Sequence, residues 1–220
     1  MTPAPDWLRS IPDRLAGVDA DWFREFAPPP NVERHSAVLM LFGEGTDGGP
    51  DVLLTERGAQ LRAHASQVSF PGGRLDPEDD GAIGAALREA EEEVGVDPAG
   101  VDVVFELPPL YLTPSQNAVT PIGAWWHTPS AVSVLSPIEV ERVVRVPIAE
   151  LTDPANRFLV DTPIGYVSPG FDVRGLFVWG FTAKLLDVTL DLAGLSRPWD
   201  ERARRPLPAH VLDAIMRRPR

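Results

Sequence analysis

The chain concentrates carboxylates in one short stretch, "LREAEEEVG", where four glutamates fall within five consecutive positions. They are Glu89, Glu91, Glu92 and Glu93. Like charges one turn apart on a helix repel each other by roughly a few tenths of a kcal/mol per pair. Solvent and counter-ions screen that repulsion on an ordinary acidic surface. Alternatively, the carboxylates hold a cation, and the neighbouring sequence has to decide between the two interpretations.

Segment 81–94 is predicted to form the helix that carries these glutamates. Asp79 or Asp80 can cap its N-terminus, and Gly95 can end it in a left-handed conformation. At about 100° per residue, the apolar side chains form one stripe that is expected to face a core. The stripe consists of Ile83, Ala86, Leu87, Ala90 and Val94.

Three of the glutamates share a second face of this helix, because Glu89, Glu92 and Glu93 are spaced i, i+3, i+4. Glu91 points elsewhere. Glu93 lies nearest the apolar border and is expected to be the least solvated of the three. Carboxylate oxygens gathered at the rim of a core suit hard cations such as Mg²⁺ or Mn²⁺, and bound Mg²⁺ commonly bridges to substrate phosphates. The pattern therefore indicates metal-dependent chemistry on a phosphate compound.

A glycine turn precedes the helix and adds to this hypothesis. In "SFPGGR", Pro71-Gly72-Gly73 predicts a tight turn whose carbonyls and amides can approach a ligand closely. The turn and the helix together resemble the Nudix box, G-x5-E-x7-R-E-U-x-E-E-x-G-U, in which U is aliphatic.

The match to this box is closest in its second half. Residues 88–96, "REAEEEVGV", follow it with the small Ala90 at an aliphatic position, and Gly73 fits the opening glycine. Asp79 stands where the first glutamate belongs, and one extra residue separates it from Arg88. The first half of the box is therefore a variant.

The resemblance to the Nudix family implies both a fold and an activity. The implied fold is α+β, an α/β/α sandwich with a central mixed sheet. The implied enzyme is a hydrolase that splits a nucleoside diphosphate linked to another moiety, with Mg²⁺ or Mn²⁺ as cofactor. Such hydrolysis needs negative charge neutralised on the phosphoryl groups and a water activated for attack, so no protein nucleophile is required.

The residue roles implied by the family fall on the box. Glu89, Glu92 and Glu93 would bind the divalent metal, with the Gly73 carbonyl assisting. Glu92 and Glu93 would also be catalytic. Arg88 would support them by holding a box glutamate through a charge-assisted hydrogen bond.

The stretch before the box narrows the choice of substrate. Residues 53–73, "LLTERGAQLRAHASQVSFPGG", resemble the extension of coenzyme A-type Nudix pyrophosphatases, L-L-T-x-R-[SA]-x3-R-x3-G-x3-F-P-G-G. Gly58 replaces its serine or alanine, and Ser66 replaces its glycine. Arg57 and Arg62 are the predicted substrate-binding residues, because a guanidinium can fork onto phosphate oxygens. The implied reaction splits coenzyme A or an acyl-CoA into (acyl)phosphopantetheine and adenosine 3′,5′-bisphosphate.

The sequence leaves more than one candidate for the general base and more than one candidate for the substrate. The base is a box glutamate or an acid from a later loop, for which Glu139 is the candidate and Glu141 the alternative. The departures at Gly58 and Ser66 leave room for another substrate, such as ADP-ribose, a dinucleotide or a nucleoside triphosphate. A ligand-sensing domain without catalysis is a third possibility, although mere binding would not require all three box glutamates.

Strands are expected to dominate the rest of the chain. The predicted strands are 36–42, 51–57, 118–126, 142–148, 157–163 and 175–181, followed by a helix over 182–194. This order indicates a mixed α+β architecture. We expect an N-terminal extension over 1–35, the hydrolase domain over 36–195 and a basic tail over 196–220.

Composition restricts the partners of this 220-residue chain. Its net charge of −12 argues against non-specific nucleic-acid binding, and without cysteine it has neither disulfides nor thiolate metal sites. No signal peptide is visible, and no apolar run reaches the roughly 20 residues of a membrane helix. We therefore expect a cytoplasmic protein that meets a small nucleoside diphosphate substrate, with no nucleic-acid or membrane partner and with homodimerisation possible.

Overall fold

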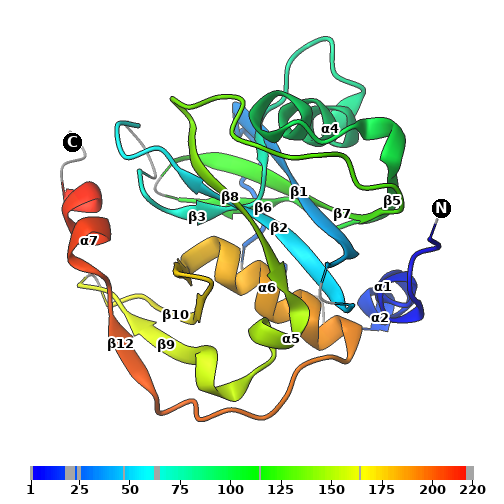
Figure 1. Ribbon diagram of the computed structural model, residues 1–220. Helices are drawn as coiled ribbons and strands as arrows, with labels where there is room; N and C mark the ends of the chain where they lie inside the picture. The colour runs from blue at the N-terminus through cyan, green and yellow to red at the C-terminus, as the bar shows by residue number, and fades with distance from the viewer. Residues whose placement is uncertain are drawn as a thin grey trace. The chain divides into compact units, whose positions relative to one another are not determined.

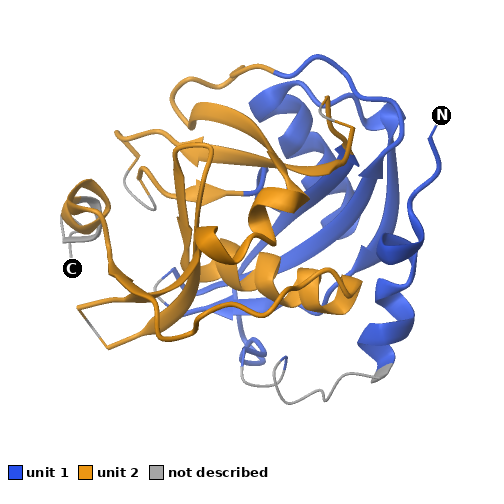
Figure 2. Ribbon diagram, turned by 60° about the horizontal axis from the view of Figure 1, so that its bottom comes forward, with its two compact units in different colours: residues 1–43, 70–132 blue, residues 44–69, 133–220 orange. Residues whose placement is uncertain are grey.

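The computed structural model (Figure 1) describes residues 2–17, 23, 26–46, 48–61, 65–113, 115–163 and 165–216. The chain forms two compact units, each built from two separate stretches of sequence (Figure 2). Unit 1 comprises residues 1–43 and 70–132, and unit 2 comprises residues 44–69 and 133–220.

Unit 1 contains the helices and strands that carry the glycine turn and the acidic helix. Its helices are α1 (Asp6–Arg9), α2 (Ile11–Gly17) and α4 (Gly81–Val94), with a short 3₁₀ helix at Pro98–Gly100. Its strands are β1 (Arg34–Glu44), β4 (Gly72–Arg74), β5 (Val101–Glu106), β6 (Leu110–Leu112) and β7 (Asn117–Trp126).

The strands of unit 1 pair around β1 and β7, which run in parallel from Arg34 beside Asn117 to Gly43 beside Trp126. β4 pairs antiparallel with β1, whereas β5 and β6 pair antiparallel with β7. Most residues of β1 and β7 are buried on both faces of the strand. Parallel strands covered on both sides need such nearly continuous apolar sequence, which explains why both segments were recognisable as strands.

The N-terminal segment packs on unit 1. Leu8 and Ile11 are fully buried, and the Trp7 ring meets the Phe42 ring edge-on at 5.5 Å between centroids. The indole Nε1 of Trp125 donates to the Thr2 carbonyl at 2.8 Å. These apolar side chains of the segment are thus packed against other residues of unit 1.

Unit 2 carries the coenzyme A-type motif and the C-terminal part of the chain. Its strands are β2 (Pro50–Arg57), β3 (Val68–Ser69), β8 (Val140–Pro147), β9 (Arg157–Asp161), β10 (Val167–Val173), β11 (Leu176–Trp179) and β12 (Arg204–Pro206). Its helices are α5 (Ile148–Leu151), α6 (Gly180–Ala193) and α7 (Ala209–Met216), with a 3₁₀ helix at Pro154–Asn156.

Two groups of strands pair within unit 2. β2 pairs antiparallel with both β3 and β8. The other group has the order β11-β10-β9-β12, in which only β12 runs parallel to its neighbour. Leu207 and Val211, which follow β12, are buried against Phe158 and Val160 of β9. The C-terminal segment therefore contributes to the core of this unit.

The predicted α+β class with mixed strand pairing is confirmed. All six predicted strands exist, but the last one ends at Trp179, and residues 180–181 instead begin α6. The strands β3, β4, β5, β6, β10 and β12 were not predicted. β10 resembled a loop because it contains Pro169 and Gly170, yet a Cβ on Gly170 would lie 2.6 Å from the Phe158 ring, so packing requires the glycine.

No helix in the described part of the chain is long and apolar enough to span a membrane.

Candidate metal and phosphate site

Helix α4 occupies the predicted positions, and its buried face overlaps the predicted stripe at Ala86, Ala90 and Val94 but is shifted. Ala85, Ala86 and Ala90 are buried together with Glu93 and Val94, whereas Ile83 is exposed. The buried face is therefore centred nearer to Glu93 than the apolar stripe suggested. The helix ends as predicted, at Gly95 with φ 79°.

The glycines of the turn let β4 pass close to both β1 and α4. Gly72 has φ 152°, and a Cβ there would lie 2.3 Å from the Ala37 carbonyl oxygen. A Cβ on Gly73 would lie 2.3 Å from the carboxylate oxygen Oε1 of Glu89. The two glycines therefore provide the space that the strand and the Glu89 carboxylate occupy.

Glu93 is the most buried of the three glutamates, with an exposed fraction of 3%, as the sequence predicted. Its Oε2 accepts a hydrogen bond from the Gly72 backbone N–H at 3.1 Å. Burying a carboxylate is unfavourable unless its charge is compensated. A backbone N–H supplies part of that compensation and fixes the side chain beside the turn.

Arg88 connects the remaining acidic groups. Its Nε and Nη2 donate to the two carboxylate oxygens of Asp79 at 2.8 and 2.9 Å, and Nη1 donates to Glu92 at 3.1 Å. Nη1 also lies 3.3 Å from a Glu89 oxygen, and Nη2 donates to the Arg74 carbonyl at 3.1 Å. One guanidinium thus ties α4 to the loop before it and to the end of β4.

This network shifts two pKa values. The hydrogen bonds from Arg88, followed by one from the Asp76 backbone N–H, lower the pKa of Asp79 to about 2. The same bond to Asp79 raises the pKa of the Arg88 guanidinium, with Glu89 adding to the effect. Both groups remain ionised throughout the neutral range.

The capping prediction was wrong for the side chains. Asp80 occupies the N-cap position without a side-chain capping bond, and the Asp79 carboxylate instead accepts from Arg88. Asp79 stands where the box has its first glutamate. The alignment with the box was therefore the feature of the sequence that could have predicted this ion pair. Apart from the glycine turn, nothing in the sequence predicted that the Gly72 amide and the Arg74 carbonyl would bond to side chains of the helix.

The side chains at this turn fit a divalent cation in chemistry. All donors are oxygen atoms, from Glu89, Glu92, Glu93 and the Gly73 backbone, which is the set that Mg²⁺ and Mn²⁺ prefer. Within the described residues, no three acidic or histidine side chains converge closely enough to enclose an ion as they stand. Glu92 is 60% exposed and pairs with Arg88.

The other predicted site residues belong to unit 2. The Gly58 backbone N–H donates to the Glu139 carbonyl at 2.9 Å, and Arg57 lies opposite Val140 where β2 pairs with β8. The structure thus brings Arg57 and the turn of Glu139 together. Glu139 and Glu141 are both exposed, so burial does not distinguish them as candidate bases. Arg62 lies outside the described residues.

One hydrogen-bond donor of the Arg57 side chain is unused among the described residues. Its Nε is buried and has no hydrogen-bond partner in the described part of the chain. Backbone bonds from the Arg57 N–H to Gln67 and from the Ser66 N–H to the Arg57 carbonyl, of 2.9 and 3.0 Å, hold the residue against the returning loop. These backbone bonds fix the main chain at Arg57, while the guanidinium group itself suits an anionic ligand.

The two departures from the coenzyme A-type pattern have structural explanations. Ser66 has φ 55°, which lies in the left-handed region that glycine adopts most readily, so the position is one that favours the pattern's glycine. A Cβ on Gly58 would lie 2.5 Å from the Ile138 carbonyl oxygen. The serine or alanine of the pattern would therefore not fit here unless the turn at Ile138 moved.

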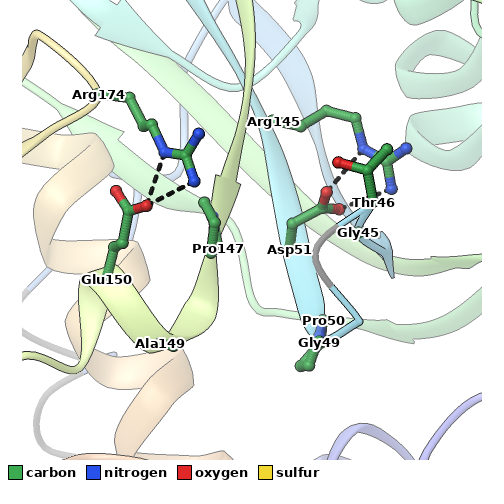
Figure 3. A pocket seen from close by; sticks show the side chains of 10 residues that line it. All are labelled: Gly45, Thr46, Gly49, Pro50, Asp51, Arg145, Pro147, Ala149, Glu150 and Arg174. Carbon is green, nitrogen blue, oxygen red and sulfur yellow. Dashed lines mark hydrogen bonds and ion pairs between the residues drawn. The ribbon is translucent and has the colours of Figure 1, made fainter.

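A cavity of about 320 Å³ lies elsewhere in unit 2, and the arginines and carboxylates that line it are equal in number. Arg145 pairs with Asp51 at 2.8 Å and Arg174 pairs with Glu150 at 2.6 Å, as Figure 3 shows. None of the predicted site residues lines this cavity. Its arginines are engaged by carboxylates, which makes it a weaker candidate for an anion than Arg57.

Comparisons with known proteins agree with the box. A family model described as NUDIX domain matches residues 33–158. The chain is 36% identical over 178 residues to "Uncharacterized Nudix hydrolase NudL" from Photorhabdus laumondii, covering 74% of this chain and 88% of the relative. It is 34% identical over 160 residues to "Nudix hydrolase 15, mitochondrial" from Arabidopsis thaliana, covering 70% of this chain and 56% of that protein.

The match thus spans little more than half the length of the plant relative. Among solved structures, a Nudix hydrolase from M. smegmatis, RenU, aligns with a TM-score of 0.45 at 20% identity, over 54% of this chain and 73% of that one.

Proposed function

This chain belongs to the Nudix hydrolase family, and we propose that it hydrolyses the diphosphate bond of coenzyme A or of an acyl-CoA with Mg²⁺ or Mn²⁺. Family members hydrolyse pyrophosphate bonds and generally use divalent metal ions. Water would attack one phosphorus of the diphosphate, and the bond from that phosphorus to the bridging oxygen would break. The products are (acyl)phosphopantetheine and adenosine 3′,5′-bisphosphate.

The observation that carries the catalytic part is the packing of the α4 carboxylates on the glycine turn. Glu93 is held by the Gly72 amide, Glu89 fills the space beside Gly73, and Glu92 remains exposed. The residues proposed to hold the metal are these three glutamates and the Gly73 carbonyl. When bound, the metal would neutralise phosphate charge and lower the pKa of a water.

The proposed tasks divide among side chains of unit 1 and, for one candidate base, a side chain of unit 2. Arg88 positions Glu89 and Glu92 while Asp79 holds the guanidinium in place. Glu92 and Glu139 are the exposed carboxylates proposed to accept the proton of the attacking water. Comparison of the pH profiles of Glu92→Gln and Glu139→Gln would identify the base, because its loss removes the acidic limb of the kcat profile.

The substrate assignment is supported by the motif that surrounds Arg57. Leu53, Leu54 and Thr55 match it in sequence, and Ser66, which replaces its glycine, has a left-handed backbone with φ 55°. Arg57 keeps a buried Nε–H without a partner among the described residues. We propose that Arg57 binds a phosphate of the substrate, with Arg62 as the second arginine of the pattern.

The test is a substrate panel. The purified chain is incubated with coenzyme A, acetyl-CoA, ADP-ribose, NADH and a nucleoside triphosphate, each with Mg²⁺ or with Mn²⁺, and the products are separated by chromatography. We expect preference for the coenzyme A compounds and no turnover after chelation with EDTA. Turnover of ADP-ribose or a nucleotide alone would contradict the substrate, and no turnover at all would favour a ligand-sensing domain.

A further inference from the structure

The turn before β8 exposes apolar side chains in an unusual way. Ile138 is 77% exposed and Leu135 is 55% exposed, the two highest values among the large apolar side chains of the described residues. Leaving such side chains in water forgoes the roughly 1.5–3 kcal/mol gained by burying each of them fully. Exposed isoleucine and leucine three residues apart therefore call for a function, and their location suggests which one.

The turn lies against the motif proposed to bind phosphate. The Gly58 N–H donates to the Glu139 carbonyl at 2.9 Å, and a Cβ on Gly58 would lie 2.5 Å from the carbonyl oxygen of Ile138. Arg57 precedes Gly58 and pairs with Val140 across the two strands. All of these residues belong to unit 2. An exposed apolar turn thus adjoins an arginine with an unused donor.

We propose that Ile138, assisted by Leu135, contacts the pantoyl part of the phosphopantetheine arm of coenzyme A and selects for this arm. This inference rests on the proposed function. In the arm, one CH₂ group separates the phosphate ester oxygen from a carbon that carries two methyl groups. A phosphate held by Arg57 brings these methyl groups near an adjacent apolar side chain.

The chemistry of the other half of the substrate differs. On the nucleoside side, the diphosphate is followed by a ribose whose hydroxyl and phosphate groups prefer polar partners. Apolar contact beside the arginine therefore distinguishes the arm from a second nucleoside, as found in dinucleotides. A difference of one or two methyl groups in an apolar contact changes affinity by roughly tenfold.

The test measures product inhibition of coenzyme A hydrolysis by the full chain. In Ile138→Ser, the inhibition constant of 4′-phosphopantetheine is expected to rise roughly tenfold, whereas that of adenosine 3′,5′-bisphosphate stays within about twofold of wild type. Ile138→Leu should restore most of the affinity for 4′-phosphopantetheine. The matched control Val167→Ser removes another exposed apolar side chain of unit 2, from β10, and should change neither constant.

The outcomes separate this inference from the proposed function. If wild type hydrolyses coenzyme A but Ile138→Ser leaves both inhibition constants unchanged, or raises both equally, the contact is refuted and the proposed function stands. Failure of 4′-phosphopantetheine to inhibit wild type at millimolar concentration also refutes the contact. If wild type does not hydrolyse coenzyme A, the proposed function fails and this inference fails with it.

Discussion

Two charged regions of this molecule contain the same residue types in different proportions. At the acidic helix of unit 1, one guanidinium, Arg88, lies within 4 Å of four carboxylates, and Glu93 adds a fifth acidic group. In the cavity of unit 2, two arginines face two carboxylates, as the pairs Arg145–Asp51 and Arg174–Glu150.

The ratio of arginines to carboxylates indicates what each region can bind. Matched pairs satisfy themselves, and such pairs near the surface typically stabilise a fold by only about 0–1 kcal/mol. A surplus of carboxylates is unfavourable unless something positive compensates it. At α4, backbone N–H groups and one arginine compensate part of the charge, and a divalent cation would compensate the rest. Substitutions in the two regions should therefore have unequal consequences.

The largest difference is expected between Glu93→Gln and Glu150→Gln. Each change keeps the shape of the side chain and removes its charge. Glu93→Gln should lower kcat by more than the roughly 10- to 100-fold typical of residues that only support metal ligands, with little change in melting temperature. Glu150→Gln in the cavity should leave kcat within about twofold. Steady-state kinetics with the preferred substrate and Mg²⁺ measures both, and a near-normal kcat for Glu93→Gln would remove Glu93 from the metal site.

A smaller effect is expected for Gly73→Ala, with Gly49→Ala as its counterpart in the wall of the cavity. The added methyl at residue 73 would lie 2.3 Å from Glu89 Oε1, so the carboxylate must move, whereas at residue 49 it meets no atom within 4 Å. Gly73→Ala should reduce kcat roughly tenfold without a large loss of stability, because the displaced group is the end of a flexible side chain. Equal activity of both variants would show that the position of Glu89 is unimportant.

The third difference concerns two arginines of unit 2: Arg57, whose Nε has no hydrogen-bond partner among the described residues, and Arg174, which pairs with Glu150. Arg57→Ala should raise KM for coenzyme A on the order of tenfold, the value of one charge-assisted hydrogen bond, with a smaller change in kcat. Arg174→Ala breaks the pair with Glu150 and should leave KM unchanged. Initial rates over a range of substrate concentrations separate the two constants. An unchanged KM in Arg57→Ala would rule out the proposed phosphate contact.

The smallest effect concerns the stability of the acidic helix in acid. The folded pKa of Asp79, about 2, lies below its ordinary value of 3.8, so its ion pair stabilises the fold above about pH 4 and loses that contribution as the pH falls toward 2. Asp79→Asn should therefore be less stable than wild type at pH 6, and the difference should shrink between pH 4 and pH 2. Urea unfolding at several pH values measures this, and a difference independent of pH would assign the effect to packing instead.

Much of the fold and part of the site followed from local pattern. The strands β1, β2 and β7 were predicted because their apolar runs are long, and α6 because it is amphipathic and ends at Gly194, which has φ 69°. β10 was missed because its Pro169 and Gly170 resemble a loop. Its identity as a strand depends on pairing with β9 and β11, which lie elsewhere in the sequence.

By itself, the sequence determined the acidic helix, its end at Gly95 and the shared face of Glu89, Glu92 and Glu93, because helical periodicity and glycine conformations are local properties. Only the tertiary structure decided that Glu93 is held by the Gly72 amide, that the Asp79 side chain pairs with Arg88 rather than capping the helix, and that Gly58 lies against the turn of Ile138. Each of these depends on groups that lie beyond one helical turn of each other in sequence, so packing, rather than local preference, determines which groups meet.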